Sequence, residues 1–173
     1  MKKILAIFIA LLFASNAFAA SGKVTVVTSF PKDLSGKFKE AFEKKHSGVT
    51  VEIVGKKTTA GIKYIQETKS NNGTDLFWAS APDAFEVLKG DGLLEKYTSK
   101  VKGIPSKVGS YPVNDPDGFY TGFAAAGYGM MWNTRYLKAN KLPEPKEWID
   151  LAKPIYFGHT GMSAPSRSGT THL

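Results

Sequence analysis

Short runs of β-branched and aromatic residues alternate along the chain with stretches whose apolar residues recur three and four positions apart. The runs predict strands at residues 23–28, 49–54 and 75–78. The helical spacing predicts helices after these strands, at residues 33–46, 58–71 and 82–90. Alternation of strand and helix on this scale is typical of βαβ units. We therefore predict an α/β fold whose first domain is a doubly wound, mostly parallel sheet covered on both faces.

Cap and turn residues mark where these helices begin and end. Asp33 is expected to cap the first helix, and Thr58 or Thr59 the second. The second helix is expected to close at Asn72, and Pro82 suits the first turn of the third. The first helix is expected to turn its apolar face inward through Leu34, Phe38, Ala41 and Phe42.

The second half of the chain has a weaker pattern. Residues 97–117 are rich in Gly, Pro, Ser and Lys, which favours a surface loop with little regular structure. Residues 119–132 mix aromatic and small residues, and we expect one or two strands there that leave the first domain for a second. Short helices are expected at residues 135–140 and 146–152.

The first 19 residues have the organisation of a secretory signal peptide. Lys2 and Lys3 precede the apolar run Ile4–Ala14, which is shorter than the roughly 20 residues that a membrane-spanning helix needs. Small residues at positions 17 and 19 fit a signal peptidase site, so we expect cleavage near Ala19 and export to a bacterial periplasm. The expected organisation is a signal peptide at 1–19, a first α/β lobe at 20–120, and crossover strands with a second lobe at 121–173.

Composition narrows the function classes. The chain has no cysteine, so an exported domain of this size must rely on a hydrophobic core and not on disulfides. Its net charge is +8, which falls to +6 without Lys2 and Lys3. The lysines are spread along the chain, which is typical of solvated surfaces but also of a field that attracts an acidic small molecule. No nucleic-acid motif is present, and the three histidines lack metal-ligand spacing, so we expect no nucleic acid, metal or cofactor.

Hydroxyl side chains follow each predicted strand. Ser29, Thr59 and Ser80 lie at turns that share one edge of a parallel sheet, where ligands of such sheets bind. Residues 166–171 gather hydroxyls, a guanidinium and a glycine, and the pattern predicts a loop running into a helix start. A helix start attracts anions through unpaired N–H groups and the helix dipole. The candidate anion-binding residues of this segment are Ser166, Arg167, Ser168, Gly169 and Thr170.

Each of these residues has a simpler interpretation. Ser and Thr at strand-to-helix turns are ordinary helix caps, and Arg167 can pair with a surface carboxylate. Ser168 and His172 lie four residues apart, which would bring them together on a helix as the nucleophile and base of an exported serine hydrolase. That hypothesis is weak, because no Gly-x-Ser-x-Gly motif or orienting carboxylate accompanies the pair. Phe30, Trp78 and Trp132 are interpreted as core aromatics more readily than as ligand contacts.

Several segments together carry a family resemblance. They are Val26–Phe30, Asp75–Ser80, Leu142–Leu151, Pro154–Gly158 and Pro165–Thr170. In these the chain resembles the extracellular solute-binding proteins of ABC importers, and more narrowly the group that includes ferric-iron, sugar-phosphate, phosphoglycerate and aminoethylphosphonate binders. Members of this family continue well beyond the length seen here. We therefore expect the chain to be the front part of a longer protein, with an incomplete second lobe.

The resemblance implies a periplasmic-binding-protein-like fold of two α/β lobes joined by crossing strands. The solute would lie between the lobes, and the loaded form would dock on a membrane permease; the complete protein would be a monomer without enzymatic activity. Ser29 and Ser80 would be first-lobe contacts, and residues 166–170 would bind the anion from the second lobe. An organic phosphate or phosphonate is the expected solute. Ferric iron is the alternative within the family, disfavoured because the loop at Ser29-Phe30 offers no His or Glu.

Overall fold

A three-stranded parallel sheet forms the centre of the first lobe. The computed structural model describes residues 21–168 and residue 171. Its sheet consists of β1 (Gly22–Thr28), β2 (Val49–Gly55) and β3 (Leu76–Trp78), in the order β2-β1-β3. Both pairings are parallel, with Val26 opposite Ile53 on one side and Leu76 on the other. The three strands expected from the sequence are confirmed, as is the α/β class.

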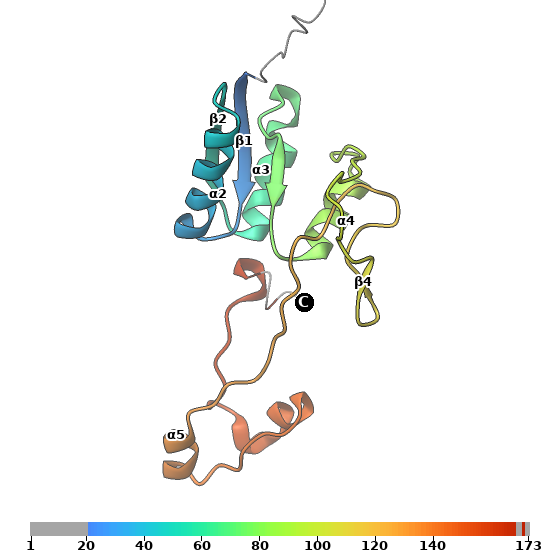
Figure 1. Ribbon diagram of the computed structural model, residues 1–173. Coiled ribbons are helices and arrows are strands. Elements are labelled where there is room, and N and C mark those ends of the chain that lie inside the picture. The colour runs from blue at the N-terminus through green and yellow to red at the C-terminus, as the bar shows by residue number, and fades with distance from the viewer. Residues whose placement is uncertain (1–20, 169–170, 172–173) are drawn as a thin grey trace, which may run out of the picture.

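Helices cover both faces of this sheet. They are α2 (Lys32–Lys45), α3 (Thr58–Thr68) and α4 (Pro82–Gly90), each following a strand (Figure 1). Phe77 and Trp78 are consecutive in β3 and therefore point to opposite faces. The Phe77 ring lies against Gly61 of α3, where a Cβ atom would be only 3.0 Å away. The Trp78 ring lies 5.0 Å from Phe38 of α2. Helices α2 and α3 therefore lie on opposite faces.

The hydrophobic core lies on the α3 side of the sheet. Val27 and Leu88 are fully buried, and the rest of the core consists of Ile65, Phe77, Ala79 and Ala84. Partly buried residues from α3, α4 and the following loop surround it, among them Ile62, Phe85 and Leu94. Full burial of a Val, Leu, Ile or Phe side chain contributes roughly 1.5–3 kcal/mol. The core is thus built where α3 and α4 pack on the sheet.

Three expectations for the first helices are wrong. Pro31 precedes α2 and Lys57 precedes α3, and neither Asp33 nor a threonine caps its helix through a side-chain hydrogen bond. Asp33 lies instead in the first turn of α2, where its negative charge favours the helix dipole. Phe38 and Phe42 are 54% and 42% exposed, so the apolar stripe of α2 is not buried. Ser35 is the buried position of this helix, because α2 packs on the sheet through a neighbouring face.

Helix α2 also protects the free edge of the sheet. Strand β2 is an edge strand, so the amide and carbonyl of Val51 have no strand partner on their outer side. Glu43 accepts a hydrogen bond from the Val51 amide at 2.7 Å, and Lys39 donates to its carbonyl at 2.7 Å. Glu43 and Lys39 also pair with each other. Hydrogen bonds from Lys39 and from the Val51 amide hold the pKa of Glu43 below its ordinary value.

The loop after α4 is fastened to that helix by charged side chains. Residues 97–117 are irregular apart from the two-residue strands β4 (Lys107–Val108) and β5 (Tyr111–Pro112), as expected. Asp115 has a side chain only 1% exposed and accepts from Lys89 of α4 at 2.8 Å. Lys89 also contacts Asp117 at 2.7 Å. The hydrogen bonds to the two carboxylates raise the pKa of Lys89. Burial alone would raise the pKa of Asp115, but the hydrogen bonds from Lys89 and from the Phe119 amide outweigh burial and lower it. These contacts hold the segment from Asp115 to Phe119 against α4.

The crossing segment contains no strand in the described part of the chain. A single bridge joins Asn114 to Thr121, and residues 122–132 continue as exposed, extended chain. The expected crossover strands are therefore wrong for the described residues, because residues 122–132 form no backbone ladder with another segment. Beyond it come α5 (Thr134–Ala139) and short 3₁₀ turns, η2 (Trp148–Ala152), η3 (Pro154–Tyr156) and η4 (Pro165–Arg167). Buried Leu137 and Tyr156 hold this small unit together.

Figure 1 shows how these parts are arranged. Residues 133–158 form a small unit below the first lobe, reached by an extended connection and left by another. The second connection carries η4 back to the first lobe, where it packs against α3. Within the described ranges no helix is both long enough and apolar enough to cross a lipid bilayer. The expected signal peptide at residues 1–19 lies outside the described residues.

The contact between α4 and the following loop predicts acid-sensitive stability. Asp115 has a lowered pKa in the folded state, so its contribution is present above the ordinary carboxyl pKa of about 3.9 and is lost as pH falls through the folded value. Asp115→Asn should lower the unfolding temperature by several degrees at pH 7. The difference from wild type should shrink at lower pH, as followed by circular dichroism.

Asp117→Asn is the matched control for this test. It removes the other carboxylate that contacts Lys89. The Asp117 side chain is 64% exposed, so its loss should change the unfolding temperature little. Equal effects of both substitutions would contradict a special role for the buried carboxylate.

Candidate functional site

The carboxyl ends of the strands border a cavity of about 720 Å³. In Figure 1 the arrow of β1 points down toward this end of the sheet, with η4 beneath it. The lining residues come from five parts of the chain: the loop after β1, the start of α3, the loop after β3, the crossing segment, and the segment that contains η4. They are Ser29, Phe30, Lys57, Thr58, Ser80, Ala126, Tyr128, Ser163, Ala164, Arg167 and Ser168.

Thr28 fixes the loops after β1 and β3 to each other. Its hydroxyl is buried, donates to the Trp78 carbonyl at 2.7 Å and accepts from the Phe30 amide at 3.1 Å. The Ser29 amide donates to the same Trp78 carbonyl at 3.3 Å. Two hydrogen bonds to the Trp78 carbonyl thus hold the loop that carries Ser29 beside the loop that carries Ser80, and the bond from the Phe30 amide closes the first loop onto Thr28. The strand ends are therefore rigid where they meet the cavity.

The start of α3 forms the next wall. The Lys56 amide donates to the Thr28 carbonyl at 2.9 Å, which ties the end of β2 to the end of β1. Lys57 then precedes the helix, and Thr58 is its buried first residue. The first N–H groups of a helix have no partner within it and carry partial positive charge. Because Lys57 and Thr58 line the cavity, this end of α3 adds its dipole to the site.

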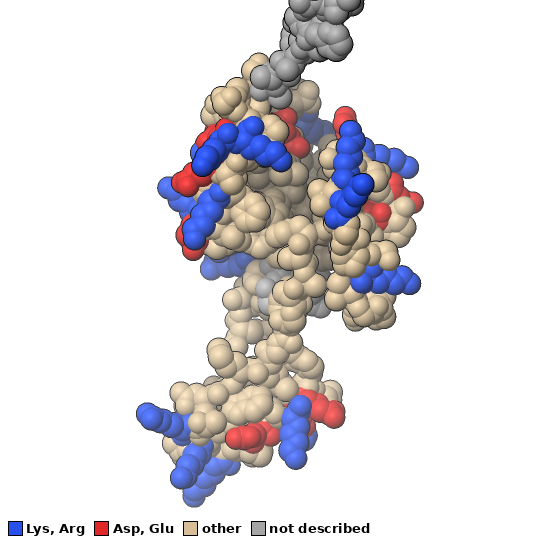
Figure 2. All heavy atoms as spheres, viewed as in Figure 1, with Lys and Arg blue, Asp and Glu red and all other residues tan. Residues whose placement is uncertain are grey.

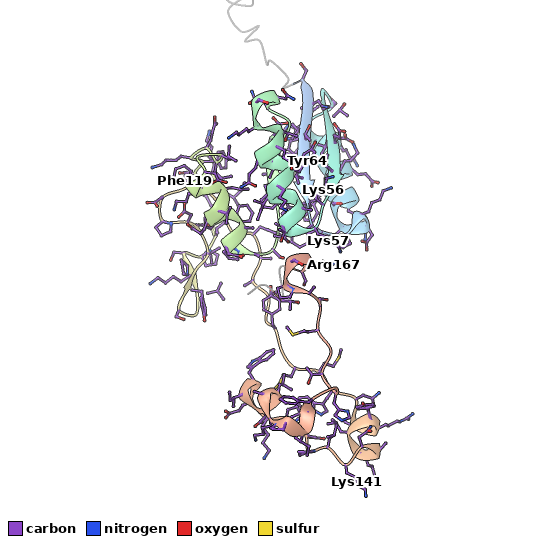
Figure 3. The ribbon with its side chains drawn as sticks, turned by 180° about the vertical axis from the view of Figure 1, so that it is seen from behind. Lys56, Lys57, Tyr64, Phe119, Lys141 and Arg167 are labelled. Carbon is purple, nitrogen blue, oxygen red and sulfur yellow. The ribbon has the colours of Figure 1, made fainter. Side chains whose placement is uncertain are left out.

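The returning segment closes the cavity from the other side. Residues Ser163, Ala164, Arg167 and Ser168 line it, and η4 packs against α3. Figure 3, viewed from behind, shows Lys57 directly above Arg167, one at the end of the first lobe and the other on η4. Two cationic side chains from segments 110 positions apart in the sequence therefore share one cavity.

Aromatic rings form the apolar part of the wall. Phe30 lies 4.9 Å from the Trp78 ring and 5.9 Å from that of Phe123, between ring centroids. Trp78 and Phe123 lie 5.6 Å apart, so the three rings form one cluster. Tyr128 lines the cavity from the crossing segment. Phe30 is thus held in place by its neighbours and presents a fixed apolar surface beside the polar groups.

The charge of the cavity is positive. Lys57 and Arg167 are its charged lining residues, and no carboxylate lines it among the described residues. Figure 2 shows that basic side chains elsewhere on this face are scattered among acidic ones, with no single basic block. The described residues contain no cluster of three or more His, Cys, Asp or Glu that could hold a metal ion. Hydroxyls, helix N–H groups and two cations are groups that bind an oxyanion.

The structure brings some of the candidate residues together and leaves others out. Ser29, Ser80, Arg167 and Ser168 line the cavity. Thr59 and Ser166 do not, although each is adjacent to a residue that does. Gly169 and Thr170 lie outside the described residues. Thr171 is described and helical, and its amide donates to the Ser168 carbonyl at 3.1 Å.

Sequence reasoning missed other parts of the lining. At the start of α3 the lining residue is Thr58 and not the neighbouring Thr59. The helix begins at Thr58, after Lys57, and not after a threonine cap. Phe30 was interpreted as core, and Lys57 as one of many solvated lysines. The Lys56-Lys57 pair at a strand-to-helix turn was the available signal for the second cation. Nothing in the sequence indicated Tyr128 or Ser163.

The sequence is similar to known solute-binding and transport proteins. A family model described as bacterial extracellular solute-binding protein matches residues 37–173. The phosphoglycerate transport regulatory protein PgtC of Salmonella typhimurium is 26% identical over 159 residues, which is 90% of this chain and 38% of PgtC. The Salmonella typhi protein of the same name matches equally. The chain thus spans well under half the length of these curated relatives.

Two solved structures share the fold. The periplasmic binding protein AfuA of Actinobacillus pleuropneumoniae, with exogenous fructose-6-phosphate bound, matches with a TM-score of 0.62 and 21% identity, over 87% of this chain and 47% of AfuA. The Trichodesmium protein IdiA (FutA), in complex with iron and citrate, matches with a TM-score of 0.51 and 21% identity, over 59% of this chain and 31% of that protein. The fold is therefore that of periplasmic binding proteins.

The role of Thr28 predicts a measurable loss of stability. Thr28→Val keeps the shape of the side chain but leaves the Trp78 carbonyl and the Phe30 amide without this buried partner. We expect a loss of about 1–3 kcal/mol in the free energy of unfolding, measured by urea titration. Thr50→Val on the exposed side of β2 is the control and should be nearly neutral. A neutral Thr28→Val would show that the hydroxyl does not hold the two loops.

Proposed function

The chain belongs to the bacterial extracellular solute-binding protein family, and from that premise we propose that it captures a small anionic solute, an organic phosphate or phosphonate, at the carboxyl edge of its sheet. The protein acts in the periplasm and delivers the solute to the membrane permease of an ABC importer. The protein acts by binding and carries out no chemistry. One observation carries the proposal: hydroxyls, a helix start and two cations line a single cavity in which no described residue is acidic.

Several kinds of hydrogen-bond donor in the cavity can each bind an oxygen of an oxyanion. The start of α3 offers N–H groups and the positive end of its dipole. Ser29 and Ser80 donate hydroxyl hydrogens from the rigid strand ends, and Ser168 does so from the opposite segment. Arg167 can hold two oxygens of a phosphate group at once, because its guanidinium presents paired donors. A tetrahedral group with three terminal oxygens satisfies more of these donors than a carboxylate does.

The aromatic wall accounts for the organic part of the solute. Phe30 and Tyr128 line the cavity beside the polar groups, and Phe30 is fixed by the rings of Trp78 and Phe123. Carbon-bound hydrogens of a sugar or short chain pack well on such faces. Two of the similar proteins bear names or titles that concern phosphorylated organic compounds, phosphoglycerate for PgtC and fructose-6-phosphate for AfuA. Both are consistent with this class of solute.

Delivery requires two lobes that move relative to each other. We assign residues 20–120 to the first lobe and residues 121–173 to the crossing segment and second lobe. Residues 122–132 are extended and exposed, so they can serve as the connection about which the lobes reorient. The cavity takes residues from both sides of this connection, so a bound solute favours the arrangement in which the sides meet.

Ferric iron with a small anion is the second candidate. The Tyr128 phenol lines the cavity, and phenolate oxygen is a good ligand for ferric iron. No imidazole or carboxylate accompanies it in the described lining, and Lys57 and Arg167 repel a metal cation. The hydrolase alternative concerns Ser168 and His172, and His172 lies outside the described residues.

Arg167 gives the direct test of anion binding. Arg167→Gln should weaken binding of phosphorylated compounds about tenfold, since one charge-assisted contact is lost. Affinities would be measured by calorimetry against phenyl phosphate, 3-phosphoglycerate, aminoethylphosphonate and ferric citrate. Arg135→Gln is a matched control, because Arg135 is the other arginine of the sequence and lies on α5 outside the cavity lining. Binding of ferric citrate with no response to any phosphorylated compound would reject the proposal.

Phe30 tests recognition of the organic part. Phe30→Ala should weaken binding of phenyl phosphate about tenfold or more while changing the affinity for inorganic phosphate little, because the ring contacts carbon and not oxygen. Phe42→Ala removes an exposed ring of α2 outside the cavity and serves as the control. An equal loss for both ligands would indicate that Phe30 acts only by supporting the loop.

A further inference from the structure

The side chains of the two cations in the cavity have no partner among the described residues, whereas several other basic groups near the sheet are paired. Lys23 pairs with Glu52, and Lys89 with Asp115 and Asp117. Lys39 pairs with Glu43. Within residues 21–168 and 171, the side chains of Lys57 and Arg167 make no ion pair, side-chain hydrogen bond or ring contact. The cavity therefore holds two uncompensated positive charges.

Lys56 shows that the lack of a side-chain partner at Lys57 depends on its position and is not shared by both lysines of the pair. It precedes Lys57, yet its ammonium group lies 5.1 Å from the centre of the Tyr64 ring on the face of α3. It does not line the cavity. Two neighbouring lysines with the same backbone support thus have different surroundings. One rests on an aromatic ring, and the other lies at the cavity together with Arg167.

We propose that Lys57 sets the charge selectivity of the site: together with Arg167 it selects a doubly charged phosphate or phosphonate end group over a singly charged one. This inference rests on the proposed function and specifies the ionic form that the site takes. Lys57 approaches the anion from the first lobe and Arg167 from η4. A dianion neutralises both charges, whereas a monoanion leaves one positive charge unmatched beside the other.

The physical basis is the repulsion between like charges in a confined space. With the cavity empty, Lys57 and Arg167 repel each other across it, which disfavours close approach of η4 to α3. An anion between them replaces this repulsion with two attractions. A phosphate monoester loses its second proton near pH 6, so it is a dianion at neutral pH. Lysine and arginine both keep their charge at that pH. Near neutral pH the two negative charges of the ester therefore balance the two positive charges of the site.

Paired esters separate charge from shape. Phenyl phosphate can carry two negative charges, and methyl phenyl phosphate carries only one while keeping the same ring and phosphorus centre. At pH 7.5 the wild-type protein should bind phenyl phosphate about tenfold more tightly than the methyl ester. The affinity for phenyl phosphate should fall as pH decreases below about 6, and that for the methyl ester should stay flat.

Substitution of Lys57 tests its role against its neighbour. Lys57→Gln should remove most of the discrimination between the two esters, and it should leave the unfolding temperature unchanged because the side chain is exposed. Lys56→Gln is the matched control and should keep the discrimination. Binding would be measured by calorimetry, with thermal unfolding of each variant as the check on folding.

The outcomes distinguish this inference from the proposed function. Equal affinity of the wild-type protein for the two esters overturns the charge selectivity but leaves phosphate binding in place. Retained discrimination in Lys57→Gln overturns the role of Lys57 alone. Failure of the wild-type protein to bind phenyl phosphate or any other phosphorylated compound overturns the proposed function and this inference with it.

Discussion

The hydrogen bonds between the carboxyl ends of β1 and β3 are the interaction on which the site depends. The Thr28 hydroxyl joins the Trp78 carbonyl to the Phe30 amide inside the protein, where water cannot substitute for either partner. These bonds place the loop of Ser29 beside the loop of Ser80 and fix the ring of Phe30 on that of Trp78. The Lys56 amide adds β2 to the same point through the Thr28 carbonyl. One buried threonine thereby organises three strand ends.

The two sides of the cavity are held with unequal strength. The first lobe has a buried core and a sheet edge covered by Lys39 and Glu43 of α2, and the loop after α4 is fastened to it by Lys89. The opposite side reaches the first lobe through the packing of η4 on α3, at the end of extended chain. Mobility is expected where buried contacts are few. A solute bound as proposed between Lys57 and Arg167 would therefore add its contacts where the protein supplies the fewest.

Much of the first lobe follows from local sequence, and the reasons for the exceptions are physical. The strands, the α/β class and Pro82 in the first turn of α4 were predictable because β-branched runs and turn residues act locally. The buried face of α2 was not, since Phe38 and Phe42 have helical spacing but the packing of the helix on the sheet decides which face is covered. The crossing segment was misjudged for a related reason. Aromatic and small residues suit a strand, but a strand also needs a partner with free hydrogen-bonding groups.

The site shows the same division between local and long-range information. Ser29 and Ser80 were predictable, because topology alone places the ends of parallel strands at one edge. Lys57 and Phe30 stand at those same edges, but their residue types have common roles elsewhere, so only the assembled cavity distinguishes them.

Under the proposed function, the composition of the cavity also bears on how a bound solute would be released. A transport protein must release what it binds, and charges that remain accessible to water hold an anion less firmly than buried ion pairs do. Lys57 and Arg167 are exposed, and the hydroxyls around them are neutral. Separation of the two sides would take one cation away from the anion and return the other to water. Under the proposed function, reversible capture would follow from the same feature as the proposed charge selectivity, the placement of the two cations on different parts of the chain.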